Sequence, residues 1–567
     1  MRTEQKMIIY QTLPRLFGNR NPTRKKGGSL AENGVGKFAD FTSSALCEIR
    51  KLGVTHIWYT GLIEHATRTD YTAFGIAREH GALVKGLAGS PYAIKDYYDV
   101  DPDLAENVPS RMAEFEALVE RTHRAGLKVI IDFVANHVAR GYCSDVKPVT
   151  VRNLGKQDDT FRSFAPNNNF YYMPGQALTL HFGATEDDFE YSEFPAKATG
   201  NDCFSLHPTQ NDWYETVKLN YGVDYVNGGG SACFDPTPDT WTKMLDILLF
   251  WAGKGVDGFR CDMAEMVPLE FWSWVIPRVK AAAQDICFIA EVYRPERYRD
   301  FLRQGGFDCL YDKVGLYDTL RDVICGKTGA TAITHCWQNV EGIQKHMLHF
   351  LENHDEQRIA SDFFAGSAQA GFPGMMVAAS MNVNPVMIYF GQELGERGMD
   401  EEGFSRRDGR TTIFDYWSIE VLQRWINGGQ FDGALLTEDE KNLRRSYAWL
   451  LNTVAREPAL AKGVFFDLMY VNRGNFCFND HRLYAFLRKH ERDVILLVVN
   501  FDSKEQTARV IIPFDAFHTL DIPDNRVAIR TDLFTGQQRV DTLTEACPYE
   551  LTVPKYGGRM LKFNYEL

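Results

Sequence analysis

The sequence predicts a (β/α)8 barrel with a subdomain inserted after its third strand and an all-β sandwich at its C-terminal end. Three observations support this fold class. Eight short apolar runs alternate with helical stretches, one connection between runs is far longer than the others, and the C-terminal part has only strand-like periodicity. A chain of 567 residues also exceeds the size at which one hydrophobic core stops growing, so more than one domain is expected.

The eight runs are the candidate barrel strands, because strands that alternate with helices are typical of a parallel sheet with crossover helices. They are Met7–Tyr10, Thr55–Tyr59, Lys128–Phe133, Val256–Cys261, Ile286–Ala290, Phe307–Tyr311, Met347–Leu351 and Pro385–Phe390. Between them, residues 110–125 have apolar residues at helical spacing and are followed by Gly126, a residue type that commonly ends helices. Residues 241–252 repeat this arrangement ahead of Gly253 and Gly255.

Connection lengths predict the domain boundaries. Residues 1–138 and 236–460 are expected to form the barrel, 139–235 the inserted subdomain and 461–567 the sandwich. Because the insert leaves the carboxyl end of a barrel strand, it is expected to overhang the rim where the sites of such barrels form. Its many aromatic residues fit a position beside a binding site.

Composition excludes several classes of protein. The formal net charge of −13 disfavours nucleic acid as a partner. The eleven cysteines show no CxxC pair, which indicates reduced thiols in a reducing compartment. The sequence contains no run of about 20 apolar residues, so no membrane-spanning helix is expected. We expect a cytoplasmic protein, or a periplasmic or secreted one if a leader has been removed; the oligomeric state stays open.

Three of the apolar runs lead into a carboxylate. Asp262 ends GVDGFRCD, Glu291 ends ICFIAE and Asp355 ends HMLHFLENHD. A single acidic residue at a strand end often caps the following helix. Three at three strand ends, which meet at one rim of a barrel, instead indicate a catalytic site.

Such a set suits glycoside cleavage, which needs two carboxylates around the bond, one ionised and one protonated. Arg260 lies two residues before Asp262 and shares its strand face, so we expect Arg260 to lower the pKa of Asp262, as a nucleophile requires. Glu291 follows apolar residues and has acidic neighbours, which disfavours a further negative charge and suits an acid.

Four segments of this sequence occur in the order and on the strands known from one family. They are DFVANHV at 132–138, GFRCDMAE at 258–265, EVY at 291–293 and FLENHD at 350–355. Together they resemble the short characteristic regions of the α-amylase family, glycoside hydrolase family 13. The resemblance implies a retaining hydrolase of α-glucans or maltodextrins, of the α-amylase, neopullulanase or cyclomaltodextrinase kind.

The resemblance also implies roles for individual residues. Asp262 is the nucleophile that forms a covalent glycosyl intermediate, Glu291 the general acid and base, and Asp355 the residue that binds sugar hydroxyls in the transition state. Arg260 orients Asp262. Further substrate-binding residues are His137, His354 and Tyr92, the last of which stacks on a sugar ring, although Ala93 stands where the family often has Asp or Ser.

A fifth segment, TVKLNYG at 216–222, is similar to the KLN form of neopullulanases and cyclomaltodextrinases, but Thr216-Val217 replaces their usual Met-Pro. The resemblance places Lys218 and Glu265 among the substrate-binding residues. A helix-start carboxylate is the alternative for Glu265.

No cofactor is required for this chemistry, and a structural calcium ion is left open. Asn136 stands where many α-amylases bind calcium, while Met266 replaces the histidine whose carbonyl usually completes the site. Calcium prefers six to eight oxygen ligands. The insert offers candidate carboxylates at Asp145, Asp158, Asp159, Asp187 and Asp188.

Two alternative functions remain. A transglycosylase or isomerase of the same family would pass the glycosyl group from Asp262 to a sugar hydroxyl, with the same first half-reaction. A non-catalytic sugar-binding relative would be expected to lack one of the carboxylates, whereas all three are present.

Overall fold

The computed structural model describes residues 6–180, 191–545 and 547–565. Its centre is a parallel sheet of eight strands, which run in the spatial order β17-β16-β15-β14-β5-β2-β1-β18. A parallel bridge between His349 and Val386 joins the two ends of this order, so the sheet closes into a barrel. The strands are β1 (Ile8–Thr12), β2 (His56–Tyr59), β5 (Lys128–Val134), β14 (Gly258–Asp262), β15 (Cys287–Ala290), β16 (Cys309–Tyr311), β17 (Met347–Leu348) and β18 (Val386–Tyr389). All eight predicted strands are confirmed.

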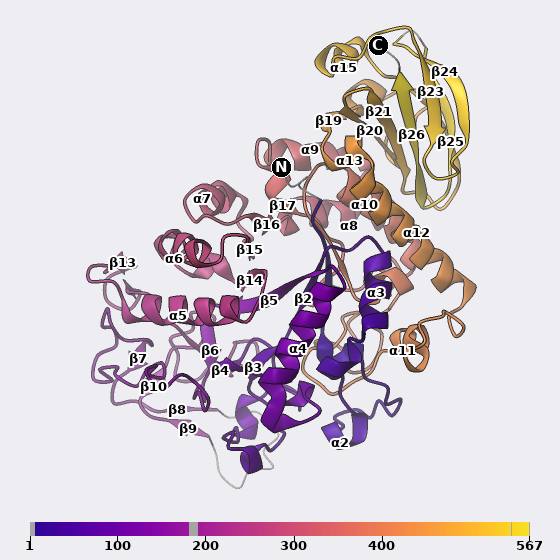
Figure 1. The fold of residues 1–567 in the computed structure, drawn as a ribbon. Helices are drawn as coiled ribbons and strands as arrows, with labels where there is room; N and C mark the ends of the chain where they lie inside the picture. The colour runs from indigo at the N-terminus through magenta and orange to yellow at the C-terminus, as the bar shows by residue number, and fades with distance from the viewer. Residues whose placement is uncertain (1–5, 181–190, 546, 566–567) are drawn as a thin grey trace.

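Helices surround the strands (Figure 1). The main ones are α3 (Ser43–Lys51), α4 (Arg111–Arg124), α5 (Asp239–Gly253), α6 (Leu269–Ala282), α7 (Tyr298–Arg303), α8 (Asp318–Ile324), α10 (Phe372–Ser380) and α12 (Glu438–Arg456). Gly126 and Gly255 have φ values of 75° and 87°, the left-handed conformation that lets the chain leave α4 and α5 and enter the next strand. Shorter helices are α1 (Pro14–Phe17), α2 (Leu30–Asn33), α9 (Ile333–Asn339), α11 (Glu420–Ile426) and α13 (Pro458–Ala461).

The predicted insert lies between β5 and α5 and is a long excursion from the barrel with little regular structure. Its strands are β6 (His137–Ala139), β7 (Tyr172–Met173), β8 (Leu178–Thr179), β9 (Ser192–Glu193), β10 (Ala196–Lys197), β11 (Thr216–Lys218), β12 (Val223–Asp224) and β13 (Ser231–Ala232). β6 and β11 pair antiparallel, which sets His137 opposite Lys218. After β2, strands β3 (Ile63–His65) and β4 (Ile94–Val100) also pair antiparallel, and this pair is called the β3–β4 hairpin below.

The C-terminal part is built from antiparallel strands. One sheet has the order β19-β20-β21-β26-β23-β24, and β22 pairs with β25. The strands are β19 (Val464–Asp467), β20 (Leu483–His490), β21 (Asp493–Asn500), β22 (Gln506–Val510), β23 (Arg526–Asp532), β24 (Gln538–Leu543), β25 (Tyr549–Val553) and β26 (Gly557–Tyr565). Two short helices that the sequence did not predict, α14 (Met469–Asn472) and α15 (Phe514–Thr519), interrupt them.

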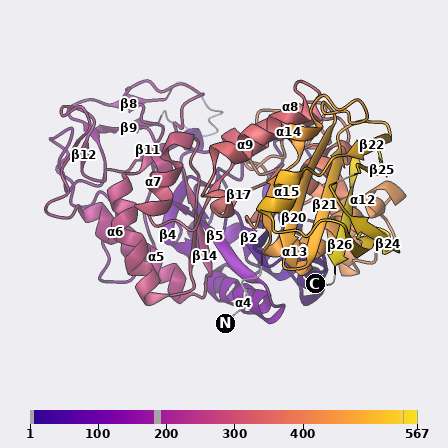
Figure 2. The same ribbon diagram turned by 90° about the horizontal axis from the view of Figure 1, so that it is seen from above.

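The C-terminal part and the excursion lie at opposite ends of the molecule (Figure 2). Arg488 of β20 fastens the C-terminal sheet to the barrel, because its buried guanidinium donates to the backbone carbonyls of Ser380, Leu460 and Gly463. In the described part of the chain, no helix has both the length and the apolar character needed to cross a membrane.

Candidate active site

The three carboxylates predicted from strand ends meet at one end of the barrel. Asp262 is the last residue of β14, Glu291 directly follows β15, and Asp355 lies in the segment after β17. All three line one cavity of about 210 Å³. Three of the residues predicted to bind sugar line the same cavity, namely Tyr92, His137 and His354.

Arg260 lies beneath this cavity and links its carboxylates. Its fully buried guanidinium is 2.6 Å from Asp262, 2.8 Å from Glu291 and 3.2 Å from Asp132. The proximity of Arg260 to Asp262 follows from their two-residue spacing on β14. The other two contacts were not predicted, because they join separate strands. Trp58 steadies Asp132 from the opposite side by donating to it at 2.9 Å.

One buried cation therefore serves three buried carboxylates, and this changes the expected protonation. Burial raises the pKa of Asp262 to about 7; Arg260 opposes the shift, while Glu291 and Asp132 add to it. Arg260 lowers the pKa of Asp262 as predicted, but burial and the neighbouring carboxylates outweigh the guanidinium, so the net shift is upward. At a pH near 7, Asp262 is therefore partly protonated in this cluster of three carboxyl groups.

The backbone after β14 is shaped to hold Glu291. Met263 has φ 43° and ψ 42°, a left-handed conformation that costs a non-glycine residue about 1–2 kcal/mol. In this conformation the Met263 N–H donates to Glu291 Oε2 at 2.8 Å. The hydroxyl of Tyr293 donates to the other carboxylate oxygen, Oε1. Strain at such a position is typical of functional sites, and no sequence pattern around Met263 predicts it.

Asp355 is held differently from the other two carboxylates. Its side chain is 36% exposed at the cavity and lies 3.0 Å from His354 Nε2. Although burial favours the neutral acid, the His354 pair outweighs it and lowers the pKa of Asp355, so this carboxylate is ionised. Tyr92 stacks on His354 with 5.1 Å between ring centroids, and its hydroxyl is 2.6 Å from His354 Nε2. Gln11 meets the other ring nitrogen at 2.8 Å.

His137 enters the cavity from β6 as a neutral ring. Burial lowers the pKa of His137 to about 3, and the cations Lys218 and Lys85 lower it further. A neutral imidazole can donate or accept a hydrogen bond without adding charge. This environment suits a hydrogen bond to a sugar hydroxyl.

The rest of the cavity wall was not predicted as a site. It includes the Lys85–Glu215 ion pair, at 2.9 Å, and the aromatic rings of Trp213, Phe404 and Phe414. Trp213 belongs to the aromatic-rich insert, and this was only a weak indication that it would line the site. Phe404 and Phe414 come from the long loop after β18, and only the fold brings them to the cavity.

Lys218 was predicted to bind substrate, but it is absent from the described lining of the cavity. Asn136, the candidate calcium ligand, is absent from that lining as well. The buried ammonium of Lys218 is 2.7 Å from the Asp202 carboxylate, donates to the Met266 carbonyl at 3.2 Å and also donates to Asn136 Oδ1. The predicted substrate contact of Lys218 therefore gives way to a structural one, in which its ammonium joins the insert to the segment after β14.

The same arrangement does not fit a calcium ion at Asn136. The oxygen atoms of Asn136, Asp202 and Met266 are the kind of ligands that calcium would use, but all three face the lysine ammonium. Asp158, another candidate ligand, instead accepts hydrogen bonds from Asn169, Phe170 and Tyr172. The candidates Asp187 and Asp188 lie outside the described residues.

A Lys218→Met variant should therefore lose stability, because it leaves the buried Asn136 Oδ1, the Met266 carbonyl and the half-exposed Asp202 carboxylate without their cation. We expect a loss of about 1–3 kcal/mol in the free energy of unfolding, measured by urea denaturation at a fixed calcium concentration. Lys51→Met is a suitable control, since Lys51 is 66% exposed and pairs with Glu48 on the surface. An equal, small loss in both variants would show that the Lys218 ammonium is not a structural cation.

Glu265 also lies away from the cavity. Its carboxylate accepts from the Arg294 guanidinium at 3.2 Å and from the Arg294 backbone N–H at 3.3 Å. Glu265 is absent from the described lining of the cavity, so its predicted role in substrate binding gains no support.

A barrel with three carboxylates, a buried arginine and two histidines at one rim defines a glycosidase-type site. Comparison with known proteins agrees. Residues 13–449 match the model of the alpha amylase catalytic domain, so the chain belongs to the alpha-amylase family.

Individual relatives are distant. Alpha-amylase 3 of Dictyoglomus thermophilum is 22% identical over 433 residues, which is 73% of this chain and 75% of that protein. Neopullulanase 2 of Thermoactinomyces vulgaris is 20% identical over 69% of this chain, and the match spans 57% of its own length. The crystal structure of an alpha-amylase from Geobacillus thermoleovorans complexed with acarbose has a TM-score of 0.65 at 17% identity and covers 100% of both chains. The family resemblance seen in the sequence is thus confirmed, and the structural likeness shows the fold.

Proposed function

We propose that this chain is a retaining hydrolase of α-glucans that acts on short maltodextrins. The observation that carries the proposal is the pair Asp262 and Glu291, held by one arginine at the rim of an alpha-amylase-family barrel. Relatives that carry alpha-amylase and neopullulanase names support the substrate class.

In the proposed mechanism, Asp262 attacks the anomeric carbon and Glu291 protonates the departing glycosidic oxygen. The contact of Arg260 with Asp262 favours the ionised carboxylate in the reacting state, and Glu291 is the group that transfers the proton. Water, activated by the same Glu291, then hydrolyses the glycosyl-Asp262 ester and releases a sugar of retained configuration.

The remaining groups of the cavity position the sugar. Asp355, ionised beside His354, accepts hydrogen bonds from hydroxyls of the ring that is being cleaved. His137 donates to the same ring, and Tyr92 packs against that ring from the cavity wall. These contacts strengthen as the ring flattens toward the oxocarbenium-like transition state, so they lower the barrier rather than only the KM.

The preference for short substrates rests on the cavity. Its volume of about 210 Å³ is below the roughly 300–1,000 Å³ typical of small-molecule sites. Trp213 and Phe414 restrict its sides. A site of this size has room for few sugar rings.

A substrate panel tests this function. Maltotriose, starch, pullulan, cyclodextrins and maltose are incubated separately with the protein, and product lengths are recorded. We expect maltotriose to give maltose and glucose, with a higher kcat/KM per chain than starch. Products longer than maltotriose would instead favour the transglycosylase alternative, and no turnover of any of these sugars would overturn the hydrolase proposal.

We further place the protein in a reducing compartment, the cytoplasm. All eleven cysteines are free thiols, and Cys261, Cys309 and Cys336 are buried in the core. Buried free thiols of this kind are typical of proteins that are kept reduced.

A further inference from the structure

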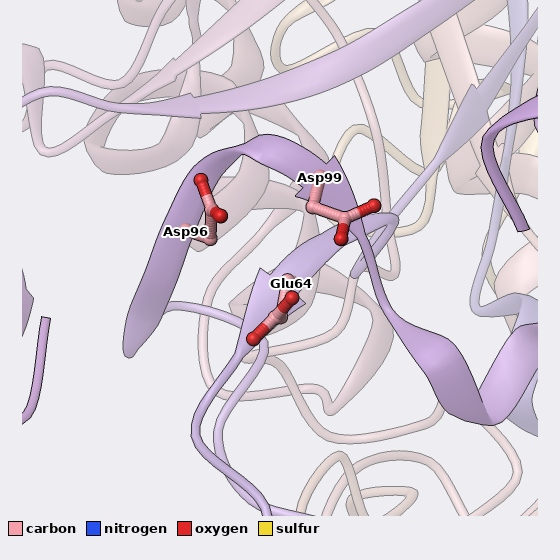
Figure 3. A group of neighbouring side chains, drawn as sticks. All are labelled: Glu64, Asp96 and Asp99. Carbon is pink, nitrogen blue, oxygen red and sulfur yellow. The ribbon is translucent and has the colours of Figure 1, made fainter. Parts of the chain in front are cut away.

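A second group of buried carboxylates lies in the β3–β4 hairpin, apart from the cavity (Figure 3). Glu64 belongs to β3, and Asp96 and Asp99 belong to β4. In a regular strand, residues three apart point to opposite faces. Here the pairing of β3 with β4 is irregular around Glu64, which faces Asp96 while its neighbour Ile63 faces Val100. This bulge brings both aspartates beside the same glutamate.

The two aspartates have hydrogen-bond donors, but Glu64 has none. Asp96 accepts from the backbone N–H groups of Tyr98 and Asp145, at 2.8 and 2.9 Å. Asp99 accepts from the guanidinium of Arg111. Glu64 is 1% exposed, and in the described structure both of its carboxylate oxygens lack a hydrogen-bond partner. An unpartnered carboxylate at this depth is costly unless something else neutralises it.

The protein cations nearby do not balance this charge. Lys95 Nζ is 4.0 Å from Glu64, beyond hydrogen-bonding distance, and lies closer to Glu79, at 3.5 Å. The Lys95 ammonium also donates to the carbonyl of Ala77. Arg111 serves Asp99 alone among the three carboxylates. The cluster thus gathers three carboxyl groups in a buried place with one guanidinium, that of Arg111, in direct contact.

We propose that Glu64, Asp96 and Asp99 bind a hard divalent cation, with calcium as the best fit. One oxygen from each carboxylate lies within 4.8 Å of the other two. Calcium binds carboxylate oxygens at about 2.3–2.6 Å, so ligands up to about twice that distance apart can reach one ion. Magnesium, with ligands at about 2.0–2.1 Å, would need a tighter group.

Such an ion would connect the β3–β4 hairpin to the start of the excursion after β5. Asp145 N–H donates to Asp96, and Cys143 N–H donates to the Lys95 carbonyl at 3.0 Å. Strand β4 begins two residues after Tyr92 of the cavity wall. The cation would therefore stabilise the position of the excursion relative to the barrel rim.

The test uses the full chain, stripped of metal with a chelator and then titrated with calcium chloride. We expect the Tm to rise with calcium concentration and equilibrium dialysis to find one calcium ion per chain that Glu64→Gln abolishes, together with the rise in Tm. Glu393→Gln serves as the matched control, because Glu393 is equally buried but pairs with Tyr10 and Arg444 elsewhere. The Tm of Glu393→Gln without calcium need not equal that of the wild type, but the rise of its Tm with calcium should persist.

Several outcomes would overturn the proposal. If calcium and manganese leave the wild-type Tm unchanged and no ion is retained in dialysis, Glu64 holds a proton instead of sharing a metal. If Glu64→Gln still binds one ion, the site lies elsewhere. Should Glu64→Gln fail to fold, Asp96→Asn replaces it, and the wild-type ion count still decides whether any ion is bound.

Discussion

An Asp262→Asn variant should lose about three to five powers of ten in kcat on maltotriose. The amide is nearly isosteric but cannot attack the anomeric carbon, so the covalent half-reaction is removed while the site is kept. Steady-state assays should give comparable KM values for the variant and the wild type, which would separate the loss of kcat from a loss of substrate binding. Asp257→Asn is a matched control, since Asp257 precedes the other end of the same strand and binds the Val129 N–H there. Equal activity in both variants would exclude Asp262 as the nucleophile.

The same variant carries a prediction about stability. A buried acid whose pKa rises from its unfolded value to about 7 favours folding at low pH, and this contribution disappears as the pH rises through 7. The neutral amide of the variant would carry no such dependence. The Tm of Asp262→Asn relative to the wild type should therefore increase between pH 5 and pH 8. If the difference in Tm between the variant and the wild type stays constant across that range, burial does not raise the pKa of Asp262.

Removing the central cation should have the largest effect on stability. Arg260→Met leaves Asp132, Asp262 and Glu291 without their shared guanidinium. Loss of one partner from a buried ion pair typically costs about 3–5 kcal/mol. We expect a loss of this size in urea denaturation at pH 8, and a smaller one at pH 5, where protons replace the missing cation.

A double variant makes this prediction specific. Adding Asp262→Asn to Arg260→Met removes one of the uncompensated anions, so the two substitutions together should cost less than the sum of their separate effects. Strict additivity would mean that Arg260 stabilises the barrel through packing and not through its charge.

The strands, the helix ends and the positions of the three carboxylates were predictable from local patterns. Alternating apolar runs mark the strands, and a parallel barrel must gather their carboxyl ends at one rim, whatever the details of packing. Asp262, Glu291 and Asp355 could therefore be placed together from the sequence. Gly126 and Gly255 marked where helices end, because their role is set by backbone geometry alone.

What could not be predicted depends on contacts between distant segments. The upward shift of the Asp262 pKa follows first from burial, and Glu291 and Asp132 on other strands add to it. The sequence of one strand reveals only the pair of Asp262 with Arg260. Lys218 has a sugar-site motif around it, yet its ammonium turns toward Asp202 and Asn136. The Glu64 cluster depends on a bulge, because regular alternation would have separated Asp96 from Asp99.

Proton NMR of the first products from maltotriose tests the central claim most directly. A glycosyl-Asp262 intermediate requires two inversions, so the newly released reducing sugar should be the α-anomer, with the β-anomer appearing only later by mutarotation. If the β-anomer forms first, the bond is cleaved by a single displacement, and Asp262 and Glu291 do not act as the nucleophile and acid described above.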